Sequence, residues 1–144
     1  MSKFFIIDTN VVVAGLLTAR SDSPVAQILD GMLAAAFAFV VSEALLSEYR
    51  AVLLRPKLAR LHGLTADEVD SLLTDMARHA IVLVPSSGPG GGPIAPDPGD
   101  QLLWSLLAMR DDLMLVTGDK LLLEDPVMQQ RIISPQALIT RLTH

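Results

Sequence analysis

Short unbroken runs of apolar residues recur along the chain, separated by stretches in which apolar residues are spaced three and four positions apart. Unbroken apolar runs are typical of strands that are buried on both faces, as in a parallel sheet. We therefore predict strands at residues 4–7, 37–41, 81–84, 113–116 and 131–133.

The stretches between these runs predict helices, because their apolar residues fall on one face at helical spacing. Pro24 suits a first helical position, and Thr65 with Glu68 resembles a capping box. Pro56 interrupts the helix that begins after Ser42. The predicted helices cover residues 11–17, 24–33, 43–54, 65–79, 100–110, 120–123 and 135–142.

The alternation of strands with helices predicts a fold of the α/β class. We expect residues 1–144 to form a single Rossmann-like, three-layer α/β/α domain with a central parallel sheet of about five strands. Between residues 85 and 99, ten of fifteen residues are glycine or proline, which predicts a loop. It is not a phosphate-binding P-loop, because no Gly-Lys-Ser/Thr sequence follows.

Composition changes this picture mainly by exclusion. Hydrophobic residues make up 51% of the 144 residues, which excludes a disordered chain. The absence of cysteine excludes disulfides, thiolate metal sites and a cysteine nucleophile. The apolar run at 32–41 is about half as long as a membrane-spanning helix must be. With no recognisable export signal, we expect a cytoplasmic protein that does not enter a membrane.

Acidic residues fall where the predicted strands end. Asp8 follows the first strand and Asp119 the fourth, while Asp97 and Asp100 stand at the end of the glycine- and proline-rich loop. Glu48 lies beside the apolar stripe of the helix after the second strand. Ligands of parallel sheets bind beyond the carboxyl ends of the strands, so these carboxylates could meet there. Such a cluster needs protons or a hard cation to neutralise it, and Mg²⁺ or Mn²⁺ suits oxygen ligands.

A cation in such a site points to phosphodiester hydrolysis, because it can supply an activated water and stabilise charge on phosphoryl oxygens. Each acid also has a purely structural explanation. Capping of the following helix would account for Asp8, Asp100 or Asp119. A turn between two prolines would account for Asp97, and a solvated helix face for Glu48. Capping does not explain why the acids gather at one sheet edge, which favours the metal site.

Several short motifs lie around these acids and between them: Ile6-Ile7-Asp8-Thr9-Asn10-Val11, Ser42-Glu43 with Ser47-Glu48-Tyr49, Leu54-Arg55-Pro56-Lys57, Asp97-Pro98-Gly99-Asp100-Gln101, Val116-Thr117-Gly118-Asp119-Lys120-Leu121-Leu122, and Ser134-Pro135 with Leu138 and Leu142. Together they resemble the PIN domain family, metal-dependent ribonucleases that include the toxins of many bacterial toxin–antitoxin pairs. The similarity covers nearly the whole chain and depends on the order and spacing of several short motifs. The run at 86–93 departs from it, being longer and richer in glycine than we expect there.

The resemblance implies that Asp8, Glu48, Asp100 and Asp119 occupy the four acidic positions of the family. Asp8 and Asp100 would then be the main ligands of Mg²⁺ or Mn²⁺. Glu48 and Asp119 would complete the pocket directly or through water, and Asp97 would assist. Without those four acids, 12 acidic residues remain against 11 basic ones, so most of the formal charge of −5 would belong to the pocket.

Other polar residues around the site carry further expectations. Thr9, Asn10 and Thr117 match polar positions of the family and would orient ligands or water. For Asn10, a helix cap is an equally good explanation. Glu43 is the alternative to Glu48, although its place at a helix start needs only the favourable helix dipole.

The resemblance implies an RNA substrate, a metal-activated water as nucleophile, and an antitoxin protein as partner, while DNA stays open as a substrate. Family members often dimerise, so it also implies a homodimer as an option, with 32–41 or 64–77 as candidate contact surfaces. Basic residues follow Glu48 and could contact RNA phosphates, with a solvated helix face as the alternative. They are Arg50, Arg55, Lys57 and Arg60.

Two other classes of protein compete with a nuclease. A phospho-signalling receiver also gathers aspartates at a sheet edge, but it needs adjacent acids after the first strand and an aspartate after the third. Here the first strand leads to Asp-Thr-Asn and the third to Val-Pro-Ser, which disfavours a receiver. A non-catalytic module that binds a metal or a protein through the acidic pocket stays open as the alternative.

Overall fold

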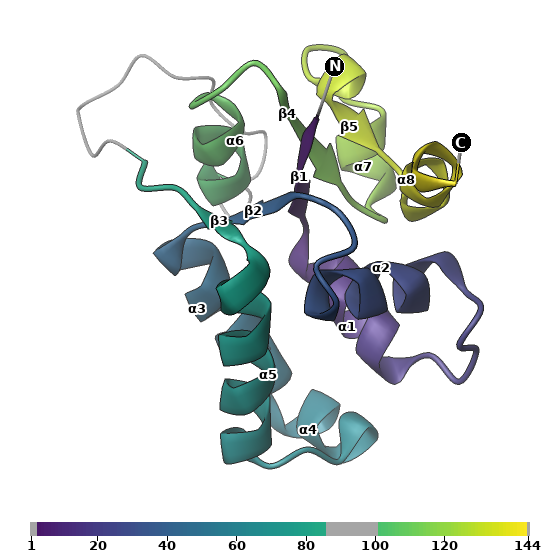
Figure 1. Ribbon diagram of the computed structural model, residues 1–144, viewed down its shortest axis with the longest axis vertical. Helices are drawn as coiled ribbons and strands as arrows, with labels where there is room; N and C mark the ends of the chain where they lie inside the picture. The colour runs from purple at the N-terminus through teal and green to yellow at the C-terminus, as the bar shows by residue number, and fades with distance from the viewer. Residues whose placement is uncertain (1–2, 86–100, 144) are drawn as a thin grey trace.

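The computed structural model describes residues 3–85 and 101–143, and its centre is a parallel β-sheet. Every neighbouring pair of strands runs parallel, in the order β3-β2-β1-β4-β5 (Figure 1). The strands are β1 (Phe4–Ile7), β2 (Phe39–Val41), β3 (Ile81–Val82), β4 (Leu113–Val116) and β5 (Ile132–Ile133). The five strands and their flanking helices confirm the predicted α/β fold, whereas a single domain over the whole chain stays a prediction.

The described residues form eight α-helices around this sheet (Figure 1). They are α1 (Thr9–Leu17), α2 (Pro24–Leu33), α3 (Glu43–Leu53), α4 (Pro56–His62), α5 (Ala66–His79), α6 (Gln101–Leu107), α7 (Lys120–Leu123) and α8 (Pro135–Leu142). Seven correspond to predicted helices, and α4 is an addition. Pro56 does not only end the preceding helix, because it also occupies the first turn of α4.

Helix boundaries follow from capping side chains. At the start of α5, the Thr65 hydroxyl accepts a hydrogen bond from the backbone N–H of Glu68, and the Glu68 carboxylate accepts one from Thr65 N–H. This reciprocal pair is the predicted capping box. Ser42 and Ser134 cap α3 and α8 in the same way, by accepting from a backbone N–H three residues on.

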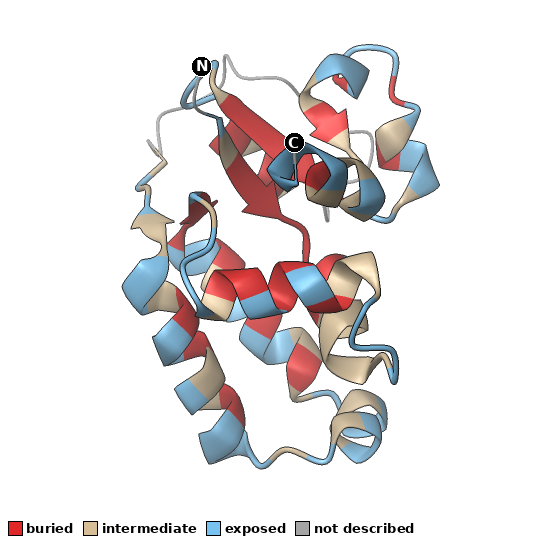
Figure 2. Ribbon diagram, turned by 45° about the vertical axis from the view of Figure 1, so that its right-hand side comes forward, coloured by how far each residue is buried: buried red, intermediate tan, exposed pale blue. Residues whose placement is uncertain are grey.

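The hydrophobic core lies on both faces of the sheet. Ile6 and Ile7 point to opposite faces, as successive strand residues must, and both are fully buried. Figure 2 shows buried residues along the strands and in stripes on the helices. The apolar run at 32–41 is divided between the end of α2 and β2, and Met32 and Phe39 are core residues. Among the described helices, none is long and apolar enough to cross a membrane.

The strand order places a topological switch point between β1 and β4. From β1 the chain adds β2 and β3 on one side, and then returns to add β4 and β5 on the other. Ile7 is in register with Val116, so the two strands end at the same level. Such a point is where ligands bind in open α/β sheets. The residues that directly follow β1 and β4, Asp8 and Thr117, therefore define the candidate site.

Candidate active site

Asp8 joins β1 to α1 and is 7% exposed. Its backbone N–H donates to the carbonyl of Val116 at 2.9 Å, which continues the pairing with β4. Its Oδ1 accepts from the backbone N–H of Thr9 at 2.7 Å, so Asp8 is also the N-cap of α1. Asp8 therefore caps α1 and also lies at the switch point, so the structural explanation and the site explanation apply to the same residue.

Thr117 connects the two strand ends and is fully buried. Its hydroxyl donates to Asp8 Oδ2 at 2.8 Å and accepts from Asn10 Nδ2 at 3.2 Å and from Asp119 N–H at 3.1 Å. Asn10 Nδ2 also donates to Asp8 Oδ2 at 3.2 Å, and Asn10 Oδ1 accepts from Gly118 N–H at 3.1 Å. This network ties the β1–α1 junction to the β4–α7 junction through the carboxylate of Asp8.

Glu48 approaches Asp8 from α3. The hydroxyl of Thr9, the residue after Asp8, donates to Glu48 Oε2. The next residue of α3, Tyr49, is fully buried and donates its phenolic hydroxyl to the carbonyl of Ile7. Burial raises the pKa of Tyr49 well above its usual value, and the negative charges of Asp8 and Glu48 add to this. The phenol therefore stays protonated and acts as a hydrogen-bond donor.

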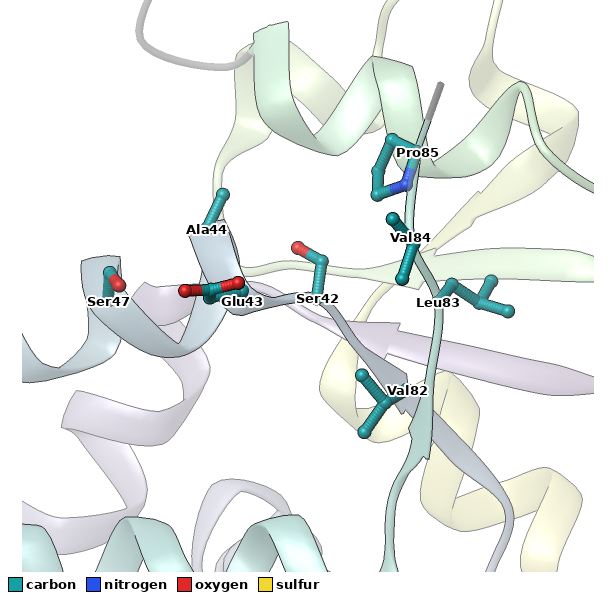
Figure 3. Close-up of a pocket in the computed structure, with 8 residues that line it drawn as sticks. All are labelled: Ser42, Glu43, Ala44, Ser47, Val82, Leu83, Val84 and Pro85. Atoms are coloured by element: carbon teal, nitrogen blue, oxygen red, sulfur yellow. The ribbon is translucent and has the colours of Figure 1, made fainter. Parts of the chain in front are cut away.

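Glu43, the alternative to Glu48, occupies a different part of the same sheet edge. It lies exposed in the first turn of α3, where it suits the helix dipole. A cavity of about 490 Å³ opens there, with Glu43 and Ser47 on one side and Val82 and Val84 on the other (Figure 3). It is Glu48, through Thr9, that the structure connects to the neighbourhood of Asp8.

Asp119 follows β4 and is partly buried. Its backbone N–H donates to Thr117, which brings the residue into the network, while its Oδ1 accepts from Leu121 N–H at 2.9 Å and caps α7. Two other predicted acids, Asp97 and Asp100, lie outside the described residues.

The described donors are compatible with a hard cation. The carboxylate oxygens of Asp8, the Thr117 hydroxyl that contacts them and the Glu48 carboxylate held by Thr9 are oxygen ligands of the type that Mg²⁺ and Mn²⁺ prefer. Within residues 3–85 and 101–143, no three acidic or histidine side chains are close enough to hold a metal by themselves. The predicted ligand Asp100 lies outside these ranges.

The basic residues predicted to contact RNA are split between two places. Arg50, on α3, binds the carboxylate of Asp70 on α5, with Nε 2.7 Å from Oδ1. Arg55, Lys57 and Arg60 are exposed and lie in or next to α4, which Figure 1 shows at the end of the molecule remote from the sheet. The structure does not bring these three to the carboxyl ends of the strands, and RNA contact by any of them stays a prediction.

Tyr49 is the polar residue near this site that the sequence interpretation missed. Its place in an apolar stripe predicts a core residue, and the ring is indeed fully buried. A buried tyrosine nevertheless needs a partner for its hydroxyl, and this one directly follows Glu48 in the sequence. That adjacency was the available signal, although it does not identify Ile7 as the acceptor.

The family of this chain follows from comparison with known proteins. No curated protein matches the chain. The sequence model of the PIN domain matches residues 5–121, which covers β1 to the start of α7 and includes Asp8, Glu48 and Thr117. Members of that family are generally nucleases that use divalent metal ions. The chain belongs to the PIN domain family.

Proposed function

We propose that this protein is a Mg²⁺- or Mn²⁺-dependent ribonuclease that hydrolyses phosphodiester bonds in RNA. The observation that carries the proposal is Asp8, a buried carboxylate at the switch point, held by side chains from both strand ends. Family membership supports nuclease chemistry, and the oxygen donors around Asp8 suit a divalent cation. When bound, such a cation supplies an activated water and stabilises charge on the phosphoryl oxygens.

The proposed roles of the acids follow from the acidic positions of the family, and those of the other polar residues from their contacts with Asp8. Asp8 and Asp100 are the main metal ligands, Glu48 and Asp119 complete the pocket directly or through water, and Asp97 assists. The polar residues that contact Asp8 keep its carboxylate in one orientation, because a hydrogen bond to a metal-ligating side chain fixes the orientation of that side chain before the metal binds. They are Thr9, Asn10 and Thr117.

The decisive assay measures cleavage of labelled single-stranded RNA with and without Mn²⁺ or Mg²⁺, in the wild type and in Asp8→Asn. We expect metal-dependent cleavage that Asp8→Asn abolishes. The matched control is Asp112→Asn, because Asp112 directly precedes β4 and so lies at the opposite end of the strand, paired with Arg110. This control should cleave at the wild-type rate.

The outcomes separate the alternatives. Cleavage that persists in excess chelator, or that Asp8→Asn leaves intact, would contradict the metal-nuclease proposal. Binding of Mn²⁺ without cleavage of any RNA would favour the non-catalytic binding module. Selective cleavage of single-stranded DNA would keep the chemistry and correct the substrate.

We further propose that the protein acts in the cytoplasm as the toxin of a toxin–antitoxin pair. The support is family resemblance alone, so the test addresses the partner directly. The neighbouring reading frame should encode a small DNA-binding protein that forms a complex with this chain and suppresses its RNA cleavage. A neighbouring product that neither binds nor inhibits would remove the toxin assignment and leave the nuclease proposal in place.

A further inference from the structure

Two hydrogen bonds connect α3 to the junction of β1 and α1, and their partners lie on either side of Asp8. Tyr49 donates to the carbonyl of Ile7, the residue before Asp8. Glu48 accepts from the hydroxyl of Thr9, the residue after it. Consecutive residues of one helix therefore hold the two neighbours of the central carboxylate.

The carbonyl of Ile7 lies where the sheet stops pairing on that side. Phe5 N–H donates to Ala38 O, so Phe5, and with it Ile7 two positions on, directs its backbone polar groups toward β2. The register of β1 with β2 ends at Ile6 and Val40, since Ser42 already begins the cap of α3. The phenol of Tyr49 takes the place of the next strand residue as donor to Ile7.

We propose that Tyr49 is a positioning residue of the metal site: its bond to Ile7 fixes the separation between the carboxylates of Glu48 and Asp8. This inference rests on the proposed function, because the separation matters only if both carboxylates serve one cation. Tyr49 acts through its neighbours and needs no contact with substrate.

The rest of α3 is secured independently of this bond. Ser42 caps its first turn, and Leu45 and Leu53 are buried in the core on the same helix. Replacing Tyr49 by phenylalanine keeps the ring and removes only the hydroxyl. The helix should stay docked in Tyr49→Phe, while the position of the Glu48 carboxylate relative to Asp8 loses one of its two restraints.

The test measures Mn²⁺ affinity by titration of the wild type, Tyr49→Phe and Leu53→Val. Free Mn²⁺ is followed by its electron paramagnetic resonance signal. Leu53 lies one helical turn after Tyr49 and packs in the core, so Leu53→Val loosens the same helix but removes neither of the two hydrogen bonds. We expect Tyr49→Phe to weaken Mn²⁺ binding about tenfold, as loss of an outer hydrogen bond does at other metal sites. Leu53→Val should bind as the wild type does.

The outcomes separate a positioning role of Tyr49 from general loosening of α3 and from failure of the proposed function. Wild-type affinity in Tyr49→Phe would overturn the inference and leave the proposed function intact. An equal loss in Leu53→Val would also overturn it, because general loosening of α3 would then explain the effect. No Mn²⁺ binding by the wild type would overturn the proposed function together with the inference. Thr9→Val, which removes the other restraint on Glu48, should weaken Mn²⁺ binding in the same direction as Tyr49→Phe.

Discussion

Two aspartates in this protein are buried to the same degree but are held in different ways. Asp8 is 7% exposed and Asp125 is 8% exposed. Asp125 follows α7, and its Oδ1 accepts from the backbone N–H groups of Val127 at 2.8 Å and Met128 at 3.3 Å. Its carboxylate thus serves the turn in which it stands.

Asp8 also accepts from a backbone N–H of its own turn, but side chains from two junctions join it. Asn10 donates to it from α1, and Thr117 donates to it from a position 109 residues later in the chain. Asp125 could be satisfied by a short isolated turn, whereas Asp8 gains the Thr117 hydroxyl as a donor only when β1 and β4 lie side by side. Burial of an acid is therefore a weak sign of a site, and convergence of distant side chains on it is a stronger one.

The largest expected effect comes from replacing each aspartate by alanine and measuring two quantities. Both variants lose a carboxylate that accepts backbone N–H groups, at the start of α1 for Asp8 and within a turn for Asp125. Each should therefore lower the free energy of unfolding by about 1 kcal/mol or more in denaturant titrations. Only Asp8→Ala should lose Mn²⁺ binding, by more than the roughly 100-fold that loss of an outer hydrogen bond costs. Equal Mn²⁺ affinity in Asp8→Ala and Asp125→Ala would show that the contact of Asp8 with Thr117 has only a structural role.

A smaller effect is expected from Thr117→Val, which keeps the shape of the side chain and removes its hydroxyl. Asp8 then loses a donor, and the N–H groups of Asn10 and Asp119 lose an acceptor. We expect Mn²⁺ affinity to fall about 10- to 100-fold, and the free energy of unfolding to fall by roughly 1–3 kcal/mol, because the site is buried.

The control for this variant is Thr140→Val. Thr140 is an exposed residue of α8 whose hydroxyl accepts from Gln136 at 3.3 Å. It should leave both Mn²⁺ affinity and stability unchanged. If Thr117→Val loses stability but binds Mn²⁺ normally, the hydrogen bonds of Thr117 stabilise the fold and do not contribute to metal binding. Asp8 would then resemble Asp125 in having partners that serve stability alone.

The fold was predictable from sequence wherever buried residues produce an apolar run or an apolar periodicity in the sequence. The apolar runs identified the five strands that the structure describes, because strands covered on both faces lack the alternation of polar and apolar residues. Helix α4 was missed for the converse reason. None of its residues is buried, so it carries no apolar periodicity, and Pro56 predicted an interruption as readily as a start.

The site was predictable only as a set of strand ends. Asp8 and Thr117 could be placed at one edge because parallel strands end together. The contacts that organise them could not be predicted, since Thr9 and Glu48 are 39 positions apart and Ile7 and Tyr49 are 42 apart. No local pattern specifies such a pair, because it depends on how deeply α3 packs against the end of β1.

The smallest expected effect concerns a third aspartate, which is neither buried nor at the site. Asp70 on α5 pairs with Arg50, both half exposed, and the hydrogen bond from Arg50 lowers the pKa of Asp70. A lowered folded-state pKa means that the pair stabilises the fold above the pKa of the unfolded chain. This contribution disappears as the pH falls through the folded-state pKa. Because the pair faces solvent, Asp70→Asn should leave the thermal midpoint at neutral pH nearly unchanged.

Asp70→Asn should instead act on RNA, because it releases Arg50 two residues after Glu48. In fluorescence anisotropy with single-stranded RNA and chelator present, we expect a modest gain in affinity that declines as salt is added. Adding Arg50→Ala should cancel the gain, since the released guanidinium is its cause. A gain that persists in the double variant would be due to the lost negative charge of Asp70 alone. If Asp70→Asn gives no gain in affinity, Arg50 does not contact RNA. If Arg50→Ala does cancel the gain, Asp70 differs from Asp8 and Asp125 because it acts by holding the guanidinium of Arg50 away from RNA.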